Sequence, residues 1–173
     1  IKVHAPEQGF DLKLVCKLEF LQHSGSFKAR GAAHYLATQS IGPEGIVAAS
    51  GGNHGAAVAW AAQRFGHPCH VFVPTIAAPA KVQRLREYGA QVHQVGEVYD
   101  DALRASRAFA AERDAQQIHA YDDPTIIAGA GTCSRELDSQ AKALDAVLLA
   151  CGGGGLSGGA AAWFGDRVPV CLL

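Results

Sequence analysis

Short apolar segments alternate with longer amphipathic ones along most of the chain, and this alternation limits the folds open to it. Strand-like segments are expected at residues 46–49, 69–73, 91–95, 116–120 and 146–150. Helices are expected between them, at residues 56–65, 79–88 and 98–112, with others beginning near residue 124 and after residue 155. Strands that alternate with helices over short connections form parallel sheets covered by helices. The sequence therefore predicts an α/β fold in which ligands bind beyond the carboxyl ends of the strands.

A single lysine, Lys28, lies between a strand-like segment at residues 14–20 and a helix-like segment at residues 29–37. It follows the aromatic Phe27, and the other residues around it are mostly small. An amine in partly apolar surroundings has a lowered pKa, so it can act as a nucleophile or as a base. The alternative interpretation is an ordinary solvated lysine near the start of a helix.

The composition argues against several classes of protein. The chain has 173 residues, of which 49% are hydrophobic, and a net charge of −1, so it lacks a basic surface for nucleic acid or an anionic membrane. No apolar run approaches the roughly 20 residues that span a bilayer. The five cysteines are scattered and support neither a disulfide framework nor a zinc site, so we expect a cytoplasmic protein. Because the chain lacks an initial methionine and ends in a strand-like segment at residues 168–173, we expect it to be part of a longer protein.

Residues 50–55 form a loop of small and polar residues between a strand-like and a helix-like segment. Small residues allow backbone amides to approach a ligand closely, and the start of the following helix favours an anion. Ser50 and Asn53 add side-chain donors, and His54 is a third candidate. The loop therefore predicts a site for a substrate carboxylate. The alternative is a simple strand-to-helix turn in which Asn53 is the N-cap.

Four successive glycines at residues 152–155 follow the strand-like segment at residues 146–150. Such a run exposes several backbone amides at the start of a helix, which is typical of a phosphate site. Residues 153–158 also match the pattern G-x-G-x-x-G of dinucleotide-binding proteins, although a run of glycines satisfies this pattern easily. A second alternative is a flexible loop that permits close packing of the strand and the helix.

A lysine able to form a Schiff base, together with a carboxylate site and a phosphate site, indicates pyridoxal phosphate as cofactor. Four motifs, in this order, resemble those of the serine/threonine dehydratases, which belong with serine racemase to fold type II of the pyridoxal phosphate enzymes. The motifs extend over nearly the whole chain, at residues 17–32, 50–55, 121–132 and 152–159.

The resemblance implies a role for each matching residue. Lys28 would bind the cofactor as a Schiff base and later move the α-proton of the substrate, Phe27 would pack near the cofactor ring, and Asn53 would bond its phenolic oxygen. The implied cofactor-binding residues are Phe27, Lys28, Asn53, Gly152, Gly153, Gly154, Gly155 and Leu156. The implied substrate-binding residues are Ser50, Gly51, Gly52, Asn53 and His54.

The resemblance also implies two domains and a homodimer. Residues 45–123 would form a small mobile substrate-binding domain. Residues 1–44 and 124–173 would form part of a large cofactor-binding domain, incomplete in this chain. The partner of the pyridine nitrogen would lie beyond Leu173; no metal site is predicted within the chain, and a requirement for a divalent metal stays open.

Four positions depart from the family pattern. Phe20 stands where an asparagine is usual, and Ala130 replaces a common glutamine. Gly51 occupies the position of the serine that is the second catalytic base of serine racemase, which disfavours racemisation. Residues 5–7 retain at most a degraded form of the usual Thr-Pro-Leu pattern.

The resulting hypothesis is β-elimination of water from L-serine or L-threonine, giving a 2-oxo acid and ammonia. Alternatives within the same fold are a hydroxyaspartate dehydratase, a threonine synthase and a serine racemase. Alternatives of other classes are a nicotinamide-dependent oxidoreductase that uses residues 153–158 and an inactive fragment. No nucleic-acid or membrane partner is expected.

Overall fold

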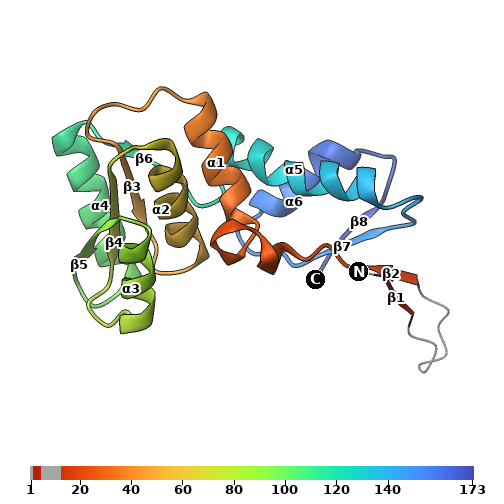
Figure 1. Ribbon diagram of the computed structural model, residues 1–173, viewed down its shortest axis with the longest axis horizontal. Helices are drawn as coiled ribbons and strands as arrows, with labels where there is room; N and C mark the ends of the chain where they lie inside the picture. The colour runs from red at the N-terminus through yellow and green to blue at the C-terminus, as the bar shows by residue number, and fades with distance from the viewer. Residues whose placement is uncertain (1, 5–12) are drawn as a thin grey trace.

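The computed structural model describes residues 2–4 and 13–173, and it shows two groups of elements on either side of the helix that begins at Lys28 (Figure 1). The strands are β1 (Lys2–His4), β2 (Lys13–Val15), β3 (Ile46–Ala49), β4 (Cys69–Val73), β5 (Gln91–Gln94), β6 (Gln116–Gln117), β7 (Val147–Leu149) and β8 (Val170–Leu172). The helices are η2 (Glu19–Leu21), η3 (His23–Gly25), α1 (Lys28–Thr38), α2 (Asn53–Phe65), α3 (Pro79–Glu87), α4 (Tyr99–Arg113), α5 (Pro124–Gln140) and α6 (Gly155–Phe164), of which η2 and η3 are 3-10 helices. In the described part of the chain, no helix is both long and apolar enough to cross a membrane.

The first group is a parallel four-stranded sheet in the order β5-β4-β3-β6. Every residue of β3 and β4 is buried, as expected for central strands of a sheet covered on both faces. Successive side chains of a strand point to opposite faces, so Ile46 packs toward α2 and α3 while Val47 packs toward α4. Figure 1 shows these helices on opposite faces of the sheet.

The second group is the helix pair α5 and α6 with a parallel ribbon of β7 and β8. Glycines allow the helices to approach closely: a Cβ added at Gly129 of α5 would lie 2.7 Å from the Cα of Gly31 in α1. A Cβ added at Gly131 would lie 3.0 Å from the carbonyl oxygen of Gly159 in α6. Helix α5 therefore packs closely against both α1, which carries Lys28, and α6, which begins at Gly155, the last of the four glycines.

Most of the expected elements are confirmed, with ends that differ by a few residues. Helix α2 begins at Asn53 rather than at residue 56, its N-cap is Gly52, and Gly66 ends it in the left-handed conformation. The strand expected at residues 116–120 ends at Gln117, because only residues 116 and 117 pair with β3 at the sheet edge.

The strand expected at residues 14–20 is wrong. Strand β2 ends at Val15, residues 16–18 form no regular element, and the 3-10 helix η2 begins at Glu19. Within residues 2–4 and 13–173, β2 pairs with β1 alone, in an antiparallel ribbon that reaches no further than Val15. Glu19 instead turns toward Arg30 and forms an ion pair. The expectation for residues 5–7 lies outside the described residues.

Candidate active site

Lys28 is the first residue of α1, directly after the N-cap residue Phe27. Its side chain is partly buried, and Nζ donates a hydrogen bond of 2.6 Å to the carbonyl oxygen of Ala120. The ring centroids of Phe27 and Tyr121 lie 5.1 and 5.9 Å from Nζ. Burial lowers the pKa of the amine, because the charged form loses its hydration. Lys28 thus has the chemical character expected of a nucleophile.

The loop that follows β3 is shaped for close approach of the backbone. Ser50 Oγ accepts a hydrogen bond of 3.2 Å from the amide of Gly52. A Cβ at Gly55 would lie only 1.9 Å from the Ser50 carbonyl oxygen, so the turn into α2 requires glycine there. Among the residues that the structure describes, no side chain caps α2. The backbone N–H groups of the first turn of α2, which begins at the exposed Asn53, are therefore available to bind an anion.

The side chain of His54 points away from this loop. The residue is 7% exposed, and Nε2 lies 3.2 Å from the carbonyl oxygen of Ile118. Because a carbonyl only accepts, the neutral imidazole carries its proton on Nε2 and donates it there. Burial first, and then electrostatic interaction with Lys28 and His119, lower the pKa of His54 to about 4. The ring is thus not a donor for a ligand, and only the backbone amide of His54 remains for that purpose.

The glycine loop lies between β7 and α6. Gly154 has a φ of 89°, in the left-handed region, and α6 begins at Gly155. A Cβ added at Gly152 or Gly154 would meet no atom within 4 Å, so these glycines border open space. No described side chain caps α6, which leaves the amides at its start without a partner within the helix. This arrangement fits a phosphate group.

Tyr121 connects the lysine to the glycine loop, and the sequence analysis did not assign it to the site. A Cβ at Gly153 would lie 2.3 Å from the Tyr121 ring, and one at Gly155 would lie 3.1 Å from the Tyr121 Cβ. The available signal was that Tyr121 opens the third family motif, at residues 121–132. It lies two positions before Asp123, whose carboxylate caps α5 by accepting from the amides of Thr125 and Ile126.

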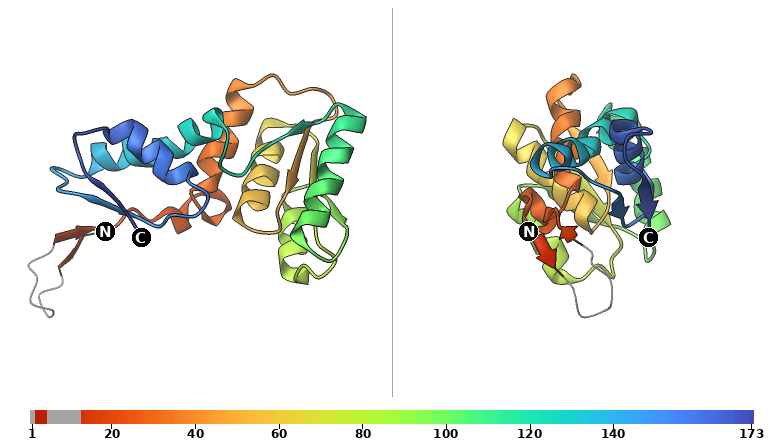
Figure 2. Two further views of the ribbon diagram at one scale, coloured as in Figure 1. Left: turned by 180° about the vertical axis from the view of Figure 1, so that it is seen from behind. Right: turned by 90° about the vertical axis from the view of Figure 1, so that its right-hand side faces the viewer.

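Residues 118–121, which cross from the four-stranded sheet to α5, join the three parts of the site. The carbonyl oxygen of Ile118 accepts from His54, at the end of the loop of residues 50–55, and that of Ala120 accepts from Lys28. Tyr121 packs against Gly153. Figure 2 shows this crossing from behind, between β6 and α5. Tertiary contacts thus bring together three segments that lie far apart in the sequence.

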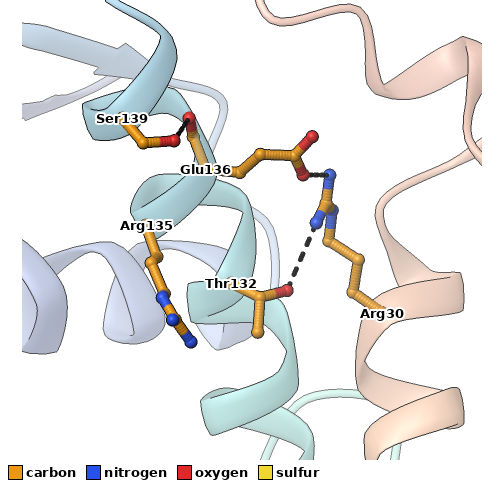
Figure 3. Close-up of a pocket in the computed structure, with 5 residues that line it drawn as sticks. All are labelled: Arg30, Thr132, Arg135, Glu136 and Ser139. Carbon is orange, nitrogen blue, oxygen red and sulfur yellow. Dashed lines mark hydrogen bonds and ion pairs between the residues drawn. The ribbon is translucent and has the colours of Figure 1, made fainter.

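Arg30 lies two residues after Lys28 and fixes α1 against its surroundings. Its guanidinium donates to both oxygens of Glu19, at 2.7 and 2.8 Å, to Glu136 at 2.5 Å and to Thr132 at 3.3 Å. Bonds from Lys17 and Arg30 lower the pKa of Glu136 to about 2. Figure 3 shows Arg30 reaching from α1 to Thr132 and Glu136 on α5.

A cavity of about 360 Å³ lies beside these side chains and is lined by Arg30, Thr132, Arg135, Glu136 and Ser139. None of the predicted site residues lines it, and the guanidinium beside it is already paired with two carboxylates. We therefore interpret this cluster as structural support for α1.

Residues 1–171 match the family model of pyridoxal-phosphate dependent enzymes. The chain belongs to this family. The match confirms the fold class expected from the sequence, and it favours pyridoxal phosphate over the dinucleotide interpretation of the glycine loop.

Three relatives illustrate the similarity. An L-threonine ammonia-lyase from Geobacter sulfurreducens is 36% identical over 171 residues, covering 98% of this chain and 42% of the relative. An L-threo-3-hydroxyaspartate ammonia-lyase from a Pseudomonas species is 38% identical over 159 residues, covering 91% and 50%. The structure of the processed form of threonine deaminase isoform 2 from Solanum lycopersicum superposes with a TM-score of 0.88 at 30% identity, covering 95% and 46%. The chain thus spans about half the length of the relatives it matches.

The described residues fit the cofactor of this family. Lys28 offers a partly desolvated amine, and the open space beside Gly152 and Gly154 leaves room for a phosphate at the uncapped start of α6. Among the described residues, no group of three or more histidine, cysteine or acidic side chains could hold a metal ion.

Proposed function

We propose that this chain contains the lysine-bearing half of a pyridoxal phosphate-dependent ammonia-lyase that converts L-serine or L-threonine to a 2-oxo acid and ammonia. The observation that carries the proposal is the partly buried amine of Lys28, held by the Ala120 carbonyl and joined to the glycine loop by Tyr121. The names of two relatives, an L-threonine ammonia-lyase and a threonine deaminase, support this choice of reaction.

When bound, the cofactor supplies an electron-accepting ring that stabilises negative charge at the α-carbon of an amino acid. Lys28 would hold the cofactor through its amine, and Nζ would be the base that accepts the α-proton of the substrate. Because burial lowers its pKa, this amine is unprotonated more often than an ordinary lysine at neutral pH.

The remaining roles are binding and orientation. The amides of residues 152–155, with Leu156, hold the cofactor phosphate at the start of α6, and Phe27 packs near the ring. Asn53 bonds the phenolic oxygen of the cofactor. The substrate carboxylate binds at the start of α2, to Ser50, residues 51–52 and the amide of His54. These donors would orient the substrate so that its α-proton faces Lys28.

The domain division and assembly belong to the same proposal. Residues 45–123, which contain the four-stranded sheet, form the small substrate-binding domain, and residues 1–44 with 124–173 contribute to the large one. We further propose a homodimer in the cytoplasm. The scattered positions of the five cysteines in the sequence support a reducing compartment.

The decisive experiment is the visible absorption spectrum of the purified protein with pyridoxal phosphate, before and after addition of L-threonine. A band of the lysine-bound cofactor that decays while a 2-oxo acid and ammonia accumulate supports the proposal. The variant Lys28→Ala should lose the band and lower kcat by at least about 10²-fold. The matched control Lys81→Ala, at an exposed position of α3, should retain both. Turnover by Lys28→Ala at the wild-type rate would overturn the proposal.

A second candidate is ammonia-lyase activity on L-threo-3-hydroxyaspartate, the activity in the name of the Pseudomonas relative. Both reactions use the same lysine, so the spectrum alone does not separate them. Comparison of kcat/KM for L-threonine, L-serine and L-threo-3-hydroxyaspartate decides between them. A preference for hydroxyaspartate of tenfold or more, about 1.4 kcal/mol in transition-state binding, would replace the first proposal.

A further inference from the structure

The segment that leads into Lys28 contains a tight turn in an uncommon conformation. Ser24, in η3, has φ 54° and ψ 16°, in the left-handed region that residues other than glycine seldom adopt. Gly25 follows with a φ of 68°, and its amide donates to the carbonyl oxygen of Gln22 at 2.8 Å. Because this turn ends three residues before Lys28, its shape determines how the chain enters α1.

An arginine from the sheet-containing half of the molecule holds this turn. Arg84 of α3 donates from Nη2 to the carbonyl oxygen of Ser24 at 2.5 Å. The bond is partly buried and comes from a charged donor, which makes it stronger than a bond between neutral groups. A Cβ added at Gly25 would lie only 3.1 Å from this nitrogen, so the glycine also leaves room for the guanidinium.

A second contact from the same half of the molecule acts on the preceding residue. The imidazole of His23 stacks on the indole of Trp60 in α2, with ring centroids 4.7 Å apart and an interplanar angle of 10°. The turn is therefore held by two helices, α2 and α3. Both helices lie within residues 45–123, whereas Lys28 begins α1, and Figure 1 shows α2 and α3 together beside the four-stranded sheet.

The turn is connected stiffly to the lysine. The carbonyl oxygen of Ser26 accepts from the amide of Ala29 at 3.2 Å, and that of Phe27 accepts from the amide of Arg30 at 2.9 Å. Residues 26 and 27 thus already take part in the first turn of α1. A displacement of Ser24 therefore shifts the backbone from which the Lys28 side chain extends.

We propose that Arg84 is a positioning residue for Lys28, acting through its bond to the Ser24 carbonyl oxygen. The inference rests on the proposed role of Lys28 in cofactor binding. The bond from Arg84 ends on the backbone of Ser24, so its effect on Lys28 passes through the backbone of residues 24–27. It also links the position of the small domain to the orientation of the lysine.

The first test is hydrogen–deuterium exchange of the cofactor-free, full-length protein. Removing the charged donor with Arg84→Ala should raise exchange in residues 23–28 by about tenfold, while exchange in α4 and α5 stays unchanged. Arg84→Lys, which keeps one cationic donor, should restore much of the protection. The matched control is Arg86→Ala, because Arg86 lies on the same helix and is exposed.

The second test is the rate at which Lys28 captures pyridoxal phosphate, followed by absorbance, together with steady-state kinetics. Arg84→Ala should slow capture and lower kcat by about tenfold with a much smaller change in KM, because the lysine and not the carboxylate site is displaced. Arg84→Lys should recover part of both rates, and Arg86→Ala should match the wild type.

Two results would overturn the inference. One is an Arg84→Ala protein that exchanges and captures the cofactor like Arg86→Ala. The other is faster exchange throughout the fold together with a lower Tm, which would make Arg84 a general stabilising residue. If the wild type itself captures no pyridoxal phosphate, the proposed function fails, and the exchange of residues 26–28 still decides whether Arg84 positions Lys28.

Discussion

The amine of Lys28 and the carbonyl oxygen of Ala120 are joined by a hydrogen bond of 2.6 Å across 92 positions of the sequence. Ala120 lies on the segment that crosses from β6 to α5, between the two halves of the molecule. Its neighbour Tyr121 packs against the glycine loop, and Ile118 binds the ring of His54. The position of the lysine therefore depends on the same short segment that aligns both candidate anion-binding loops.

The contact between Tyr121 and the glycine loop predicts the effect of Gly153→Ala. A Cβ there would lie 2.3 Å from the Tyr121 ring, so the loop or the ring must move. We expect binding of pyridoxal phosphate to weaken by about tenfold, which a titration of the cofactor absorbance measures. In a Tyr121→Ala background the same substitution should have a smaller effect. Equal losses in both backgrounds would show that the clash is not the cause.

The ion-pair cluster around Arg30 predicts a large difference between two arginines. The Arg30 side chain is only 11% exposed and is paired with Glu19 and Glu136. Arg30→Ala would leave the 17% exposed Glu19 carboxylate unpaired. We therefore expect the free energy of unfolding, measured in urea, to fall by about 3 kcal/mol. Arg104→Ala is the control, because Arg104 is 71% exposed in its pair with Asp101. Its loss should lower the free energy of unfolding by less than about 1 kcal/mol. Similar losses for the two variants would contradict this account.

The close approach of α1 and α5 predicts that Gly129 tolerates no side chain. A Cβ there would lie 2.7 Å from the backbone of α1, so Gly129→Ala should destabilise the protein by about 1–3 kcal/mol through overpacking. Gly158→Ala in α6 is the matched control, since its Cβ would meet Ile127 at an ordinary 3.6 Å. Alanine is also favoured over glycine within a helix, so this control should be neutral or slightly stabilising. Thermal unfolding of both variants measures the difference.

The buried histidine of α2 predicts a loss of stability in mild acid. Its folded pKa of about 4 lies below the ordinary value of 6.5, so the unfolded chain binds the extra proton first as the pH falls. The contribution of neutral His54 to the free energy of unfolding should be fully present well above pH 6.5. It should be lost between about pH 6.5 and 4, and the free energy of unfolding should be lower by about 2 kcal/mol at pH 5. Urea unfolding at pH 8 and pH 5 measures this change.

The variant His54→Gln tests that assignment, because glutamine can still donate to the Ile118 carbonyl but does not titrate. The decrease between pH 8 and pH 5 should become smaller in this variant. Burial also lowers the pKa values of His70 and His93, whose ring nitrogens lie 3.2 Å apart, so part of the decrease should remain. An unchanged pH dependence in His54→Gln would exclude His54 as a source.

The sequence alone determined the order and type of most elements, because these depend on local features. Gly66 ends α2 in the left-handed conformation, and Pro79 begins α3, both signals that need no tertiary context. The position of Lys28 at the start of a helix, and the run of four glycines that leads into α6, could be predicted for the same reason. The match of residues 1–171 to the pyridoxal-phosphate dependent enzymes agrees with the family resemblance found in the sequence.

The tertiary structure alone decided where the site side chains point and what supports them. The loop motif gave no indication that His54 turns inward to Ile118, because that direction depends on a segment 64 positions away. Tyr121 and Arg84 act through contacts with Gly153 and Ser24, which no local pattern encodes. The expected strand at residues 14–20 failed for a related reason: strand propensity is realised only where a neighbouring strand pairs with it, and beyond Val15 the chain turns toward Arg30 instead.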